Sequence, residues 1–221
     1  MKTLITISLS TLILIAALNF SGCVKEENNE YPDVTAVNDT VYGTLKYKQP
    51  ESTGGKIVDW PYGTATFKVI AGSSEVISTA PVNADGTFMV VLPATVSGSY
   101  MSSLADVALS QNGSVVATPN TVRFLSTLQY KVDYSFEGTD KTIITNLYKL
   151  KSDNTVEKSY FFNFYDMDGT LKGTGAYGNV FNWNFIKGWG VVESYVINTT
   201  NNAFSSTSLN AVPAGTVWVN L

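Results

Sequence analysis

Residues 122–136, VRFLSTLQYKVDYSF, decide the fold that the sequence predicts. From residue 128 onward, apolar and polar side chains alternate without interruption. Successive side chains of a β-strand point to opposite sides, so this alternation places one set against a core and the other in solvent. The apolar set is Leu128, Tyr130, Val132, Tyr134 and Phe136, and the polar set is Gln129, Lys131, Asp133 and Ser135. The stretch therefore predicts a half-buried β-strand.

A second stretch, residues 155–165 (TVEKSYFFNFY), is apolar on both faces of the strand that it predicts. One face carries Tyr160, Phe162 and Phe164, and the other carries Phe161 and Tyr165. A strand without a polar face is typical of the centre of a sheet that is covered on both sides. A turn at residues 151–154 (KSDN) joins it to the strand predicted over residues 141–150, which makes a hairpin.

Short β-rich runs alternate with turn residues through the rest of the chain. They lie at residues 41–48, 64–70, 75–79, 87–92, 170–173, 190–198 and 216–220. The one helix that the pattern predicts covers residues 102–111. With 14% charged and 12% aromatic residues, the composition also favours strands. We therefore expect an all-β protein with two β-sandwich-like lobes, at residues 39–119 and 120–221.

The turn chemistry of the first lobe carries a family resemblance over roughly residues 38–105. The matching pieces are Gly43-Thr44-Leu45, residues 64–69, Asp85-Gly86-Thr87-Phe88, Leu92-Pro93 and Ser97-Gly98-Ser99-Tyr100. They resemble the carboxypeptidase regulatory-like, transthyretin-type domains, although Gly98 lies five residues past Pro93 rather than beside it. The resemblance implies a seven-stranded sandwich that spaces, presents or binds, with no catalytic residues to carry over.

The first residues have the pattern of a secretory leader. Met1 and Lys2 precede an apolar run over residues 4–18, which is long enough for a signal peptide and short for a membrane-spanning helix. Residues 20–23 (FSGC) resemble a lipobox, which implies that residues 1–22 are a lipoprotein signal peptide and that Cys23 carries the acyl chains, palmitate among them. An ordinary secretory peptide with an incidental cysteine is the alternative. Residues 23–38 then predict a flexible tether.

Three charged residues follow the cysteine at once. Lys25, Glu26 and Glu27 resemble the export signal of surface lipoproteins in Gram-negative anaerobes. The resemblance implies an outer-membrane protein that is held by its lipid and exposed on the cell surface. The alternative is that these residues only keep the tether solvated, because charged, Asn-rich segments do not fold.

Composition excludes several classes of function. A net charge of -4, with Arg123 as the single arginine, gives no basic face for nucleic acid. The sequence has no histidine and one cysteine, which excludes the histidine-dependent triads and the common zinc sites. No pattern selects a catalytic pair among the carboxylates Asp133, Glu137, Asp166, Asp168 and Glu193. We therefore expect no enzyme, no cofactor and no metal. The segment Asp166-Met167-Asp168-Gly169 resembles the start of a calcium loop, but it fits a hairpin turn equally well.

The candidate ligand residues are aromatic. Tyr177, Trp183 and Trp189 lie in segments rich in Gly and Asn, where side chains tend to be exposed. Aromatic planes flanked by amides suit glycans, so we expect a non-catalytic binding or accessory module; the alternative is that these rings belong to the core. A second hypothesis is a fimbrial or adhesin-type subunit that assembles by strand addition, with residues 216–220 as the strand to watch. The partners expected are the membrane and either a glycan or an outer-membrane protein.

Overall fold

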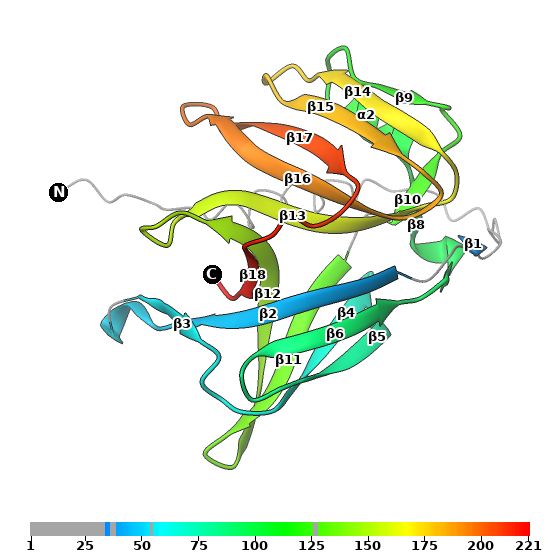
Figure 1. Ribbon diagram of the computed structural model, residues 1–221. Coiled ribbons are helices and arrows are strands. Elements are labelled where there is room, and N and C mark those ends of the chain that lie inside the picture. Colours follow the sequence, from blue (N-terminus) through cyan, green and yellow to red (C-terminus); the bar gives the residue numbers. More distant parts are fainter. Residues whose placement is uncertain (1–33, 36–38, 54, 126–127) are drawn as a thin grey trace.

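The computed structural model describes residues 34–35, 39–53, 55–125 and 128–221, and this part of the chain is all-β, as predicted (Figure 1). One seven-residue α-helix lies among its strands. In chain order the strands and the helix are β1 (Val34–Thr35), β2 (Asp39–Lys48), β3 (Ile57–Asp59), β4 (Ala65–Ala71), β5 (Glu75–Val82), β6 (Thr87–Leu92), β7 (Thr95–Val96), β8 (Met101–Ser103), α2 (Leu104–Ser110), β9 (Val116–Thr118), β10 (Arg123–Leu125), β11 (Leu128–Phe136), β12 (Thr139–Leu150), β13 (Val156–Tyr165), β14 (Gly169–Thr174), β15 (Val180–Phe185), β16 (Gly188–Asn198), β17 (Ala203–Leu209) and β18 (Thr216–Val219). Two short 3-10 turns, η1 (Glu51–Thr53) and η2 (Gly98–Tyr100), complete the elements.

Seven of the strands close into a barrel, in the order β11-β4-β5-β6-β2-β18-β12. Closure depends on the long strand β12, because its first half pairs with β11 up to Thr145 and its second half pairs with β18 from Asn146 onward. The pairing of β18 with β2 is parallel, and it ties the C-terminal strand to the start of the described chain. The sequence predicted a first sandwich, and the structure has a closed barrel in its place.

The remaining strands extend from the barrel as an outer sheet. From β12 the sheet continues through β13, β16, β17, β15, β14 and β9, and β10 and β8 attach beside β13. Figure 1 shows the outer sheet as a second layer above the barrel, with α2 behind β14 and β15. The helix begins where the hydroxyl of Ser103 accepts a hydrogen bond from the backbone N–H of Asp106, which caps its first turn.

Strand β13 and its neighbour β16 form a wall that separates two hydrophobic cores. Tyr160, Phe162 and Phe164 pack into the barrel-side core together with residues such as Phe67, Val132 and Trp218. Tyr165 and Phe161 pack on the opposite side, against Leu104, Leu171 and Phe185. The sequence predicted a central strand buried on both faces, and this prediction is confirmed.

A tight turn at residues 83–86 joins β5 to β6, and it explains one glycine. Gly86 donates its N–H to the carbonyl of Asn83 at 2.9 Å, and the Asp85 carboxylate accepts from the N–H of Thr87 at 2.9 Å. Gly86 has φ +83, and a Cβ there would lie 2.6 Å from the carbonyl oxygen of Leu45. Only glycine therefore lets the turn pass this close to β2.

The barrel takes strands from both sides of the predicted lobe boundary at residues 119 and 120. β2, β4, β5 and β6 come from the first segment, and β11, β12 and β18 come from the second. Within the predicted tether, β1 pairs with β7. The predicted signal peptide, Cys23 and the charged residues at 25–27 lie outside the described residues.

Candidate functional site

Five aromatic side chains meet at the end of the barrel where β2 and β11 finish. This ring cluster consists of Tyr47, Trp60, Tyr62, Tyr134 and Phe136. Tyr62 stands at its centre and stacks on Tyr134, with 4.5 Å between ring centroids and 23° between ring planes. The edges of Tyr47, Trp60 and Phe136 meet the Tyr62 ring at 5.0, 5.1 and 5.2 Å. Offset and edge-to-face contacts of this kind stabilise aromatic groups beyond the area that they bury.

The ring cluster joins the core to the surface. Trp60 is 4% exposed and donates its indole N–H to the carbonyl of Gly63 at 2.7 Å, so it closes the barrel end. Tyr47, Tyr62 and Tyr134 are half-buried against the barrel-side core, and Phe136 is 45% exposed. Part of each outer ring therefore faces solvent while its other side is fixed by packing.

The tyrosine hydroxyls of the ring cluster influence one another. Burial raises the pKa of Tyr62, and hydrogen bonding to the hydroxyl of Tyr47 raises it further. Burial also raises the pKa of Tyr134, and the neighbouring Tyr47 adds to the effect. A raised pKa favours the neutral phenol, so these hydroxyls keep their protons and act as hydrogen-bond donors at neutral pH.

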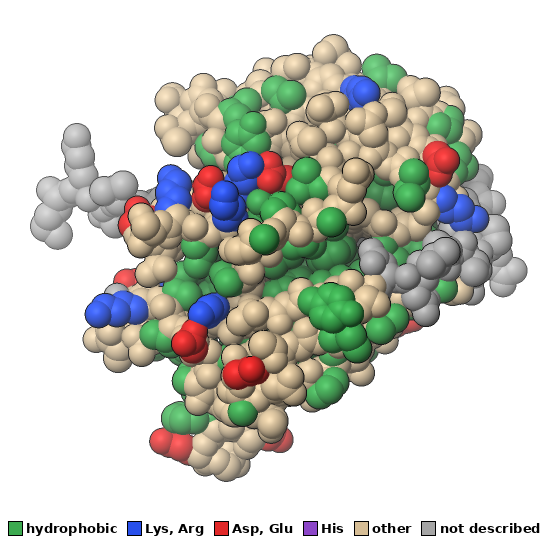
Figure 2. Space-filling view, in the orientation of Figure 1, with side chains coloured by type: hydrophobic (Ala, Val, Ile, Leu, Met, Phe, Trp, Pro, Cys, Tyr) green, Lys and Arg blue, Asp and Glu red, His purple; other side chains and the backbone are tan. Residues whose placement is uncertain are grey.

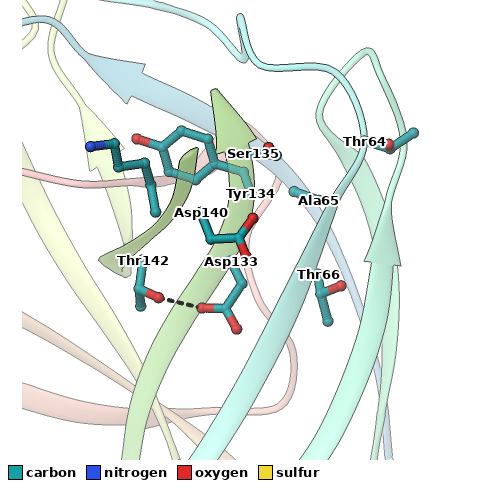
Figure 3. Close-up of a pocket in the computed structure, with 9 residues that line it drawn as sticks. Thr64, Ala65, Thr66, Asp133, Tyr134, Ser135, Asp140 and Thr142 are labelled. Carbon is teal, nitrogen blue, oxygen red and sulfur yellow. Dashed lines mark hydrogen bonds between the residues drawn. The ribbon is translucent and has the colours of Figure 1, made fainter. Parts of the chain in front are cut away.

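A polar hollow of about 480 Å³ opens beside the ring cluster, across β4, β11 and β12 (Figure 3). Its lining consists of Thr64, Ala65, Thr66, Asp133, Tyr134, Ser135, Asp140, Lys141 and Thr142. Figure 3 shows the hydroxyl of Thr142 donating to the Asp133 carboxylate, over 2.6 Å. Tyr134 is the one residue that belongs to both the ring cluster and the hollow.

Asp133 is held as an ionised acceptor within this hollow. The ammonium group of Lys68 lies 2.5 Å from its carboxylate. Hydrogen bonds from Lys68 and then from Thr142 lower the pKa of Asp133. A carboxyl group with a lowered pKa carries its negative charge at neutral pH, so it accepts hydrogen bonds and does not supply a proton.

The three ligand residues that the sequence predicted do not come together. Trp183 is 5% exposed in the core of the outer sheet, where its indole N–H donates to the hydroxyl of Ser206. Trp189 is 8% exposed in the barrel-side core and donates to the carbonyl of Pro93 at 2.8 Å. The ring faces of Trp183 and Trp189 are covered by protein, which agrees with the alternative that these rings belong to the core. Tyr177 is 70% exposed, between β14 and β15.

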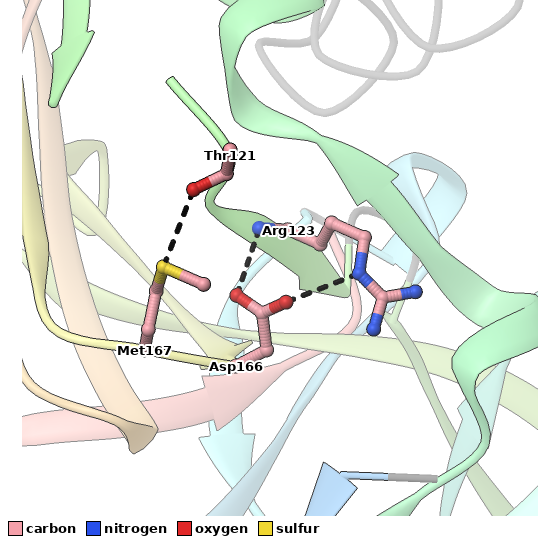
Figure 4. A network of polar contacts seen from close by, with 4 residues as sticks. All are labelled: Thr121, Arg123, Asp166 and Met167. Carbon is pink, nitrogen blue, oxygen red and sulfur yellow. Dashed lines mark hydrogen bonds and ion pairs between the residues drawn. The ribbon is translucent and has the colours of Figure 1, made fainter. Parts of the chain in front are cut away.

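The aspartates of the possible calcium loop have partners within the protein. Asp166 accepts hydrogen bonds from the backbone N–H of Arg123 at 2.8 Å and from its Nε at 3.0 Å, while Thr121 approaches Met167 beside them (Figure 4). Asp168 accepts from the N–H of Lys187 at 2.7 Å, which joins the turn that precedes β14 to the turn that follows β15. The two carboxylates therefore stabilise turns and strand ends.

Glu193, another of the candidate carboxylates, lies on the barrel-facing side of the outer sheet. It accepts from the ammonium group of Lys158 at 2.7 Å and from the hydroxyl of Tyr160 at 3.0 Å. Among the described residues, no three Asp, Glu, Cys or His side chains are grouped closely enough to hold a metal ion. The described helix is also too short to cross a membrane.

The strand considered for assembly lies inside the molecule's own barrel. β18 pairs with β12 on one side and with β2 on the other, and Trp218 is 1% exposed in the core. Assembly by strand addition stays a prediction, and in this structure its suggested donor strand closes the barrel.

Comparisons with protein-family models, with curated proteins and with solved structures found no match to this chain. The ring cluster was missed by sequence reasoning, although residues 59–63 (DWPYG) place two aromatic residues around a proline in a turn. Such a segment predicts exposed rings, but it does not reveal that Tyr47 and Tyr134 lie beside them.

Proposed function

We propose that this protein is a lipoprotein displayed on a bacterial outer membrane and that its barrel binds glycans, without catalysis, at the ring cluster. The proposed lipid anchor and surface location are supported by the sequence pattern around Cys23 and by the charged residues Lys25, Glu26 and Glu27. The binding role is supported by the chemistry at the barrel end.

The observation that carries the binding role is that Tyr134 belongs to both the ring cluster and the polar hollow. A sugar ring has an apolar face of C–H groups and an edge of hydroxyls. It therefore needs an aromatic plane beside hydrogen-bonding groups, which is the usual make-up of a ligand site. Tyr62 and Tyr134 supply planes that are already stacked and fixed, while Lys141, directly opposite Tyr134 in the pairing of β11 with β12, supplies a polar group on the same side of the sheet.

Two features support binding rather than hydrolysis at this place. Glycoside hydrolysis uses a carboxylic acid whose pKa is raised, so that it can protonate the leaving group. The pKa of Asp133 is instead lowered by Lys68 and Thr142. The tyrosine hydroxyls stay neutral because their pKa values are raised, and neutral phenols donate and accept hydrogen bonds without transferring a proton.

The glycan role is tested by native electrophoresis through gels that contain soluble glucans, mannans, xylans or galactans. We expect at least one polysaccharide to retard the protein, and we expect Tyr62→Ala to remove this retardation. Tyr177→Ala is the matched control, because Tyr177 is exposed and lies outside the ring cluster. Retardation lost in the Tyr177 variant alone would move the site there, and no retardation by any polysaccharide would overturn the glycan role.

The lipid anchor and the surface location are tested separately, in cells. Labelled palmitate should enter the protein, and Cys23→Ala should abolish the label. Protease added to intact cells should remove the labelled protein if it faces outward. Replacing Lys25, Glu26 and Glu27 with Ala should leave the label in place and protect the protein from protease. Absence of label on the unchanged protein would overturn the lipid anchor.

A further inference from the structure

The outer face of the barrel carries an apolar patch that its fold does not cover. Tyr42, Met89 and Val91 form this barrel-face patch, and they are 74%, 50% and 42% exposed. Tyr42 lies directly opposite Met89 in the pairing of β2 with β6, and Val91 lies opposite Thr40. The neighbouring side chains of β6, Phe88 and Val90, point into the core, so the patch is the outward half of an alternating strand.

The side chains directly around the barrel-face patch are uncharged, and charged groups begin farther off, at Lys68 of β4, opposite Thr79, and at the exposed Glu75 at the start of β5. The outward positions of β6, of the first half of β2 and of β5 from Thr79 onward carry Thr79, Pro81, Thr87, Met89, Val91, Thr40, Tyr42 and Thr44. Figure 2 shows hydrophobic side chains gathered over β2 and β6 within a neutral surface, while the lysines and carboxylates gather around the other end of β2. A neutral face with a protruding tyrosine suits the interface of a lipid bilayer, where tyrosine is enriched.

The described chain begins next to the strands that carry this face. β1 pairs with β7, which follows β6 by three residues, and β2 then begins at Asp39 beside Leu92. The stretch between Cys23 and β1 spans at most roughly 40 Å when fully extended. A tether of this length holds the barrel at a high effective concentration next to the bilayer, so a small patch is enough to determine which face turns toward it.

We propose that the barrel-face patch docks on the membrane that holds the lipid anchor, with Tyr42 and Met89 at the headgroup level. This inference rests on the anchor in the proposed function. It gives the barrel one orientation on the membrane instead of free rotation on its tether. Tyr47 of the ring cluster lies roughly 16 Å farther along β2 and points to the opposite side of that strand, so docking leaves the proposed glycan site open.

The test uses the chain from residue 23 onward, coupled through its single cysteine to a maleimide lipid in vesicles of phosphatidylethanolamine and phosphatidylglycerol. Hydrogen peroxide then oxidises the methionines, which react according to their exposure. We expect coupling to slow the oxidation of Met89 by roughly threefold or more and to leave that of Met167, in the outer sheet region, unchanged. Equal rates for Met89 on coupled and free protein would overturn the docking.

Matched variants identify the surface responsible. Tyr42→Ser with Val91→Ser should abolish the protection of Met89, whereas Leu109→Ser with Ile186→Ser, at exposed apolar positions outside the patch, should retain it. Protection that also appears in the free protein as its concentration rises would show a second copy on the patch and would overturn membrane docking. Because coupling supplies the anchor chemically, failure here is distinct from a missing palmitate label in cells or a missing retardation by glycans.

Discussion

Two groups of aromatic residues in this protein have similar composition but differ in how far they are buried. The wall, on β13 and its neighbours, contains Phe162, Phe164 and Trp189, which are 4%, 0% and 8% exposed. The ring cluster also packs against the barrel-side core, but its Tyr62 and Tyr134 are half-buried and hold each other by stacking. Aromatic density along the sequence therefore marks the wall, whereas the proposed binding surface is built where the density is lower.

The difference follows from what covers each group. β13 is hydrogen-bonded to strands on both sides and is covered by a core on each face. The ring cluster lies at the barrel end, where β2 and β11 finish and where a closed sheet has no further layer to cover it. Large rings at such an end stay partly in water while their inner edges add to the core.

The largest expected effect on stability comes from removing a buried ring from the wall. Phe164→Ala removes a ring that is 0% exposed and packs edge-on against Trp189 at 5.1 Å. We expect the free energy of unfolding, measured by urea denaturation, to fall by about 3 to 5 kcal/mol. The matched change in the ring cluster is Phe136→Ala, where the ring is 45% exposed and the loss should be about 1 kcal/mol. Equal losses at the two sites would contradict the distinction between wall and cluster.

Local patterns predicted strand β11 and the wall, but not the assembly of the ring cluster. The alternation over residues 128–136 and the two apolar faces of residues 155–165 are fixed by neighbouring residues, so one sequence is enough to recognise them. The ring cluster combines residue 47 with residues 60–62 and 134–136, which only the closed barrel brings together. Barrel closure itself depends on the parallel pairing of β18 with β2, between opposite ends of the chain.

Trp183 was predicted to be exposed because of the composition of its segment, although the alternation of the same segment indicates burial. Glycine and asparagine around it suggested exposure, yet Asn182 and Asn184 are exposed on one face of β15 while Trp183 is buried on the other. The alternation was therefore present in the sequence. What the sequence could not show is that Ser206 of β17, which pairs with β15, accepts the indole N–H and makes its burial favourable.

An intermediate effect is expected at Tyr130, a tyrosine that is buried where those of the ring cluster are not. It is 3% exposed, and its hydroxyl accepts a hydrogen bond from the backbone N–H of Phe162 at 3.3 Å, which links the barrel to the wall. Tyr130→Phe leaves that N–H without its partner. We expect the free energy of unfolding at pH 7 to fall by about 1 to 3 kcal/mol.

The pH dependence of this loss has a definite sign. Burial raises the pKa of Tyr130 above its ordinary value of 10.0, so the folded protein keeps the proton when the unfolded chain loses it. The stabilisation by neutral Tyr130 is therefore complete below pH 10 and is lost as the pH rises above it. Urea denaturation at several pH values should show the stabilities of Tyr130→Phe and the unchanged protein converging above pH 10. Parallel curves would mean that Tyr130 is accessible to solvent.

The smallest effect on stability is expected at the centre of the ring cluster. Tyr62→Phe keeps the ring that stacks on Tyr134 and removes only a half-buried hydroxyl, which water replaces as a partner. We expect the free energy of unfolding to change by no more than about 0.5 kcal/mol, as at ordinary surface positions. Retardation in polysaccharide gels should nevertheless weaken, because the hydroxyl beside Tyr47 would no longer meet the sugar. A large loss of stability with unchanged retardation would place Tyr62 with the wall residues, as a packing residue instead of a ligand contact.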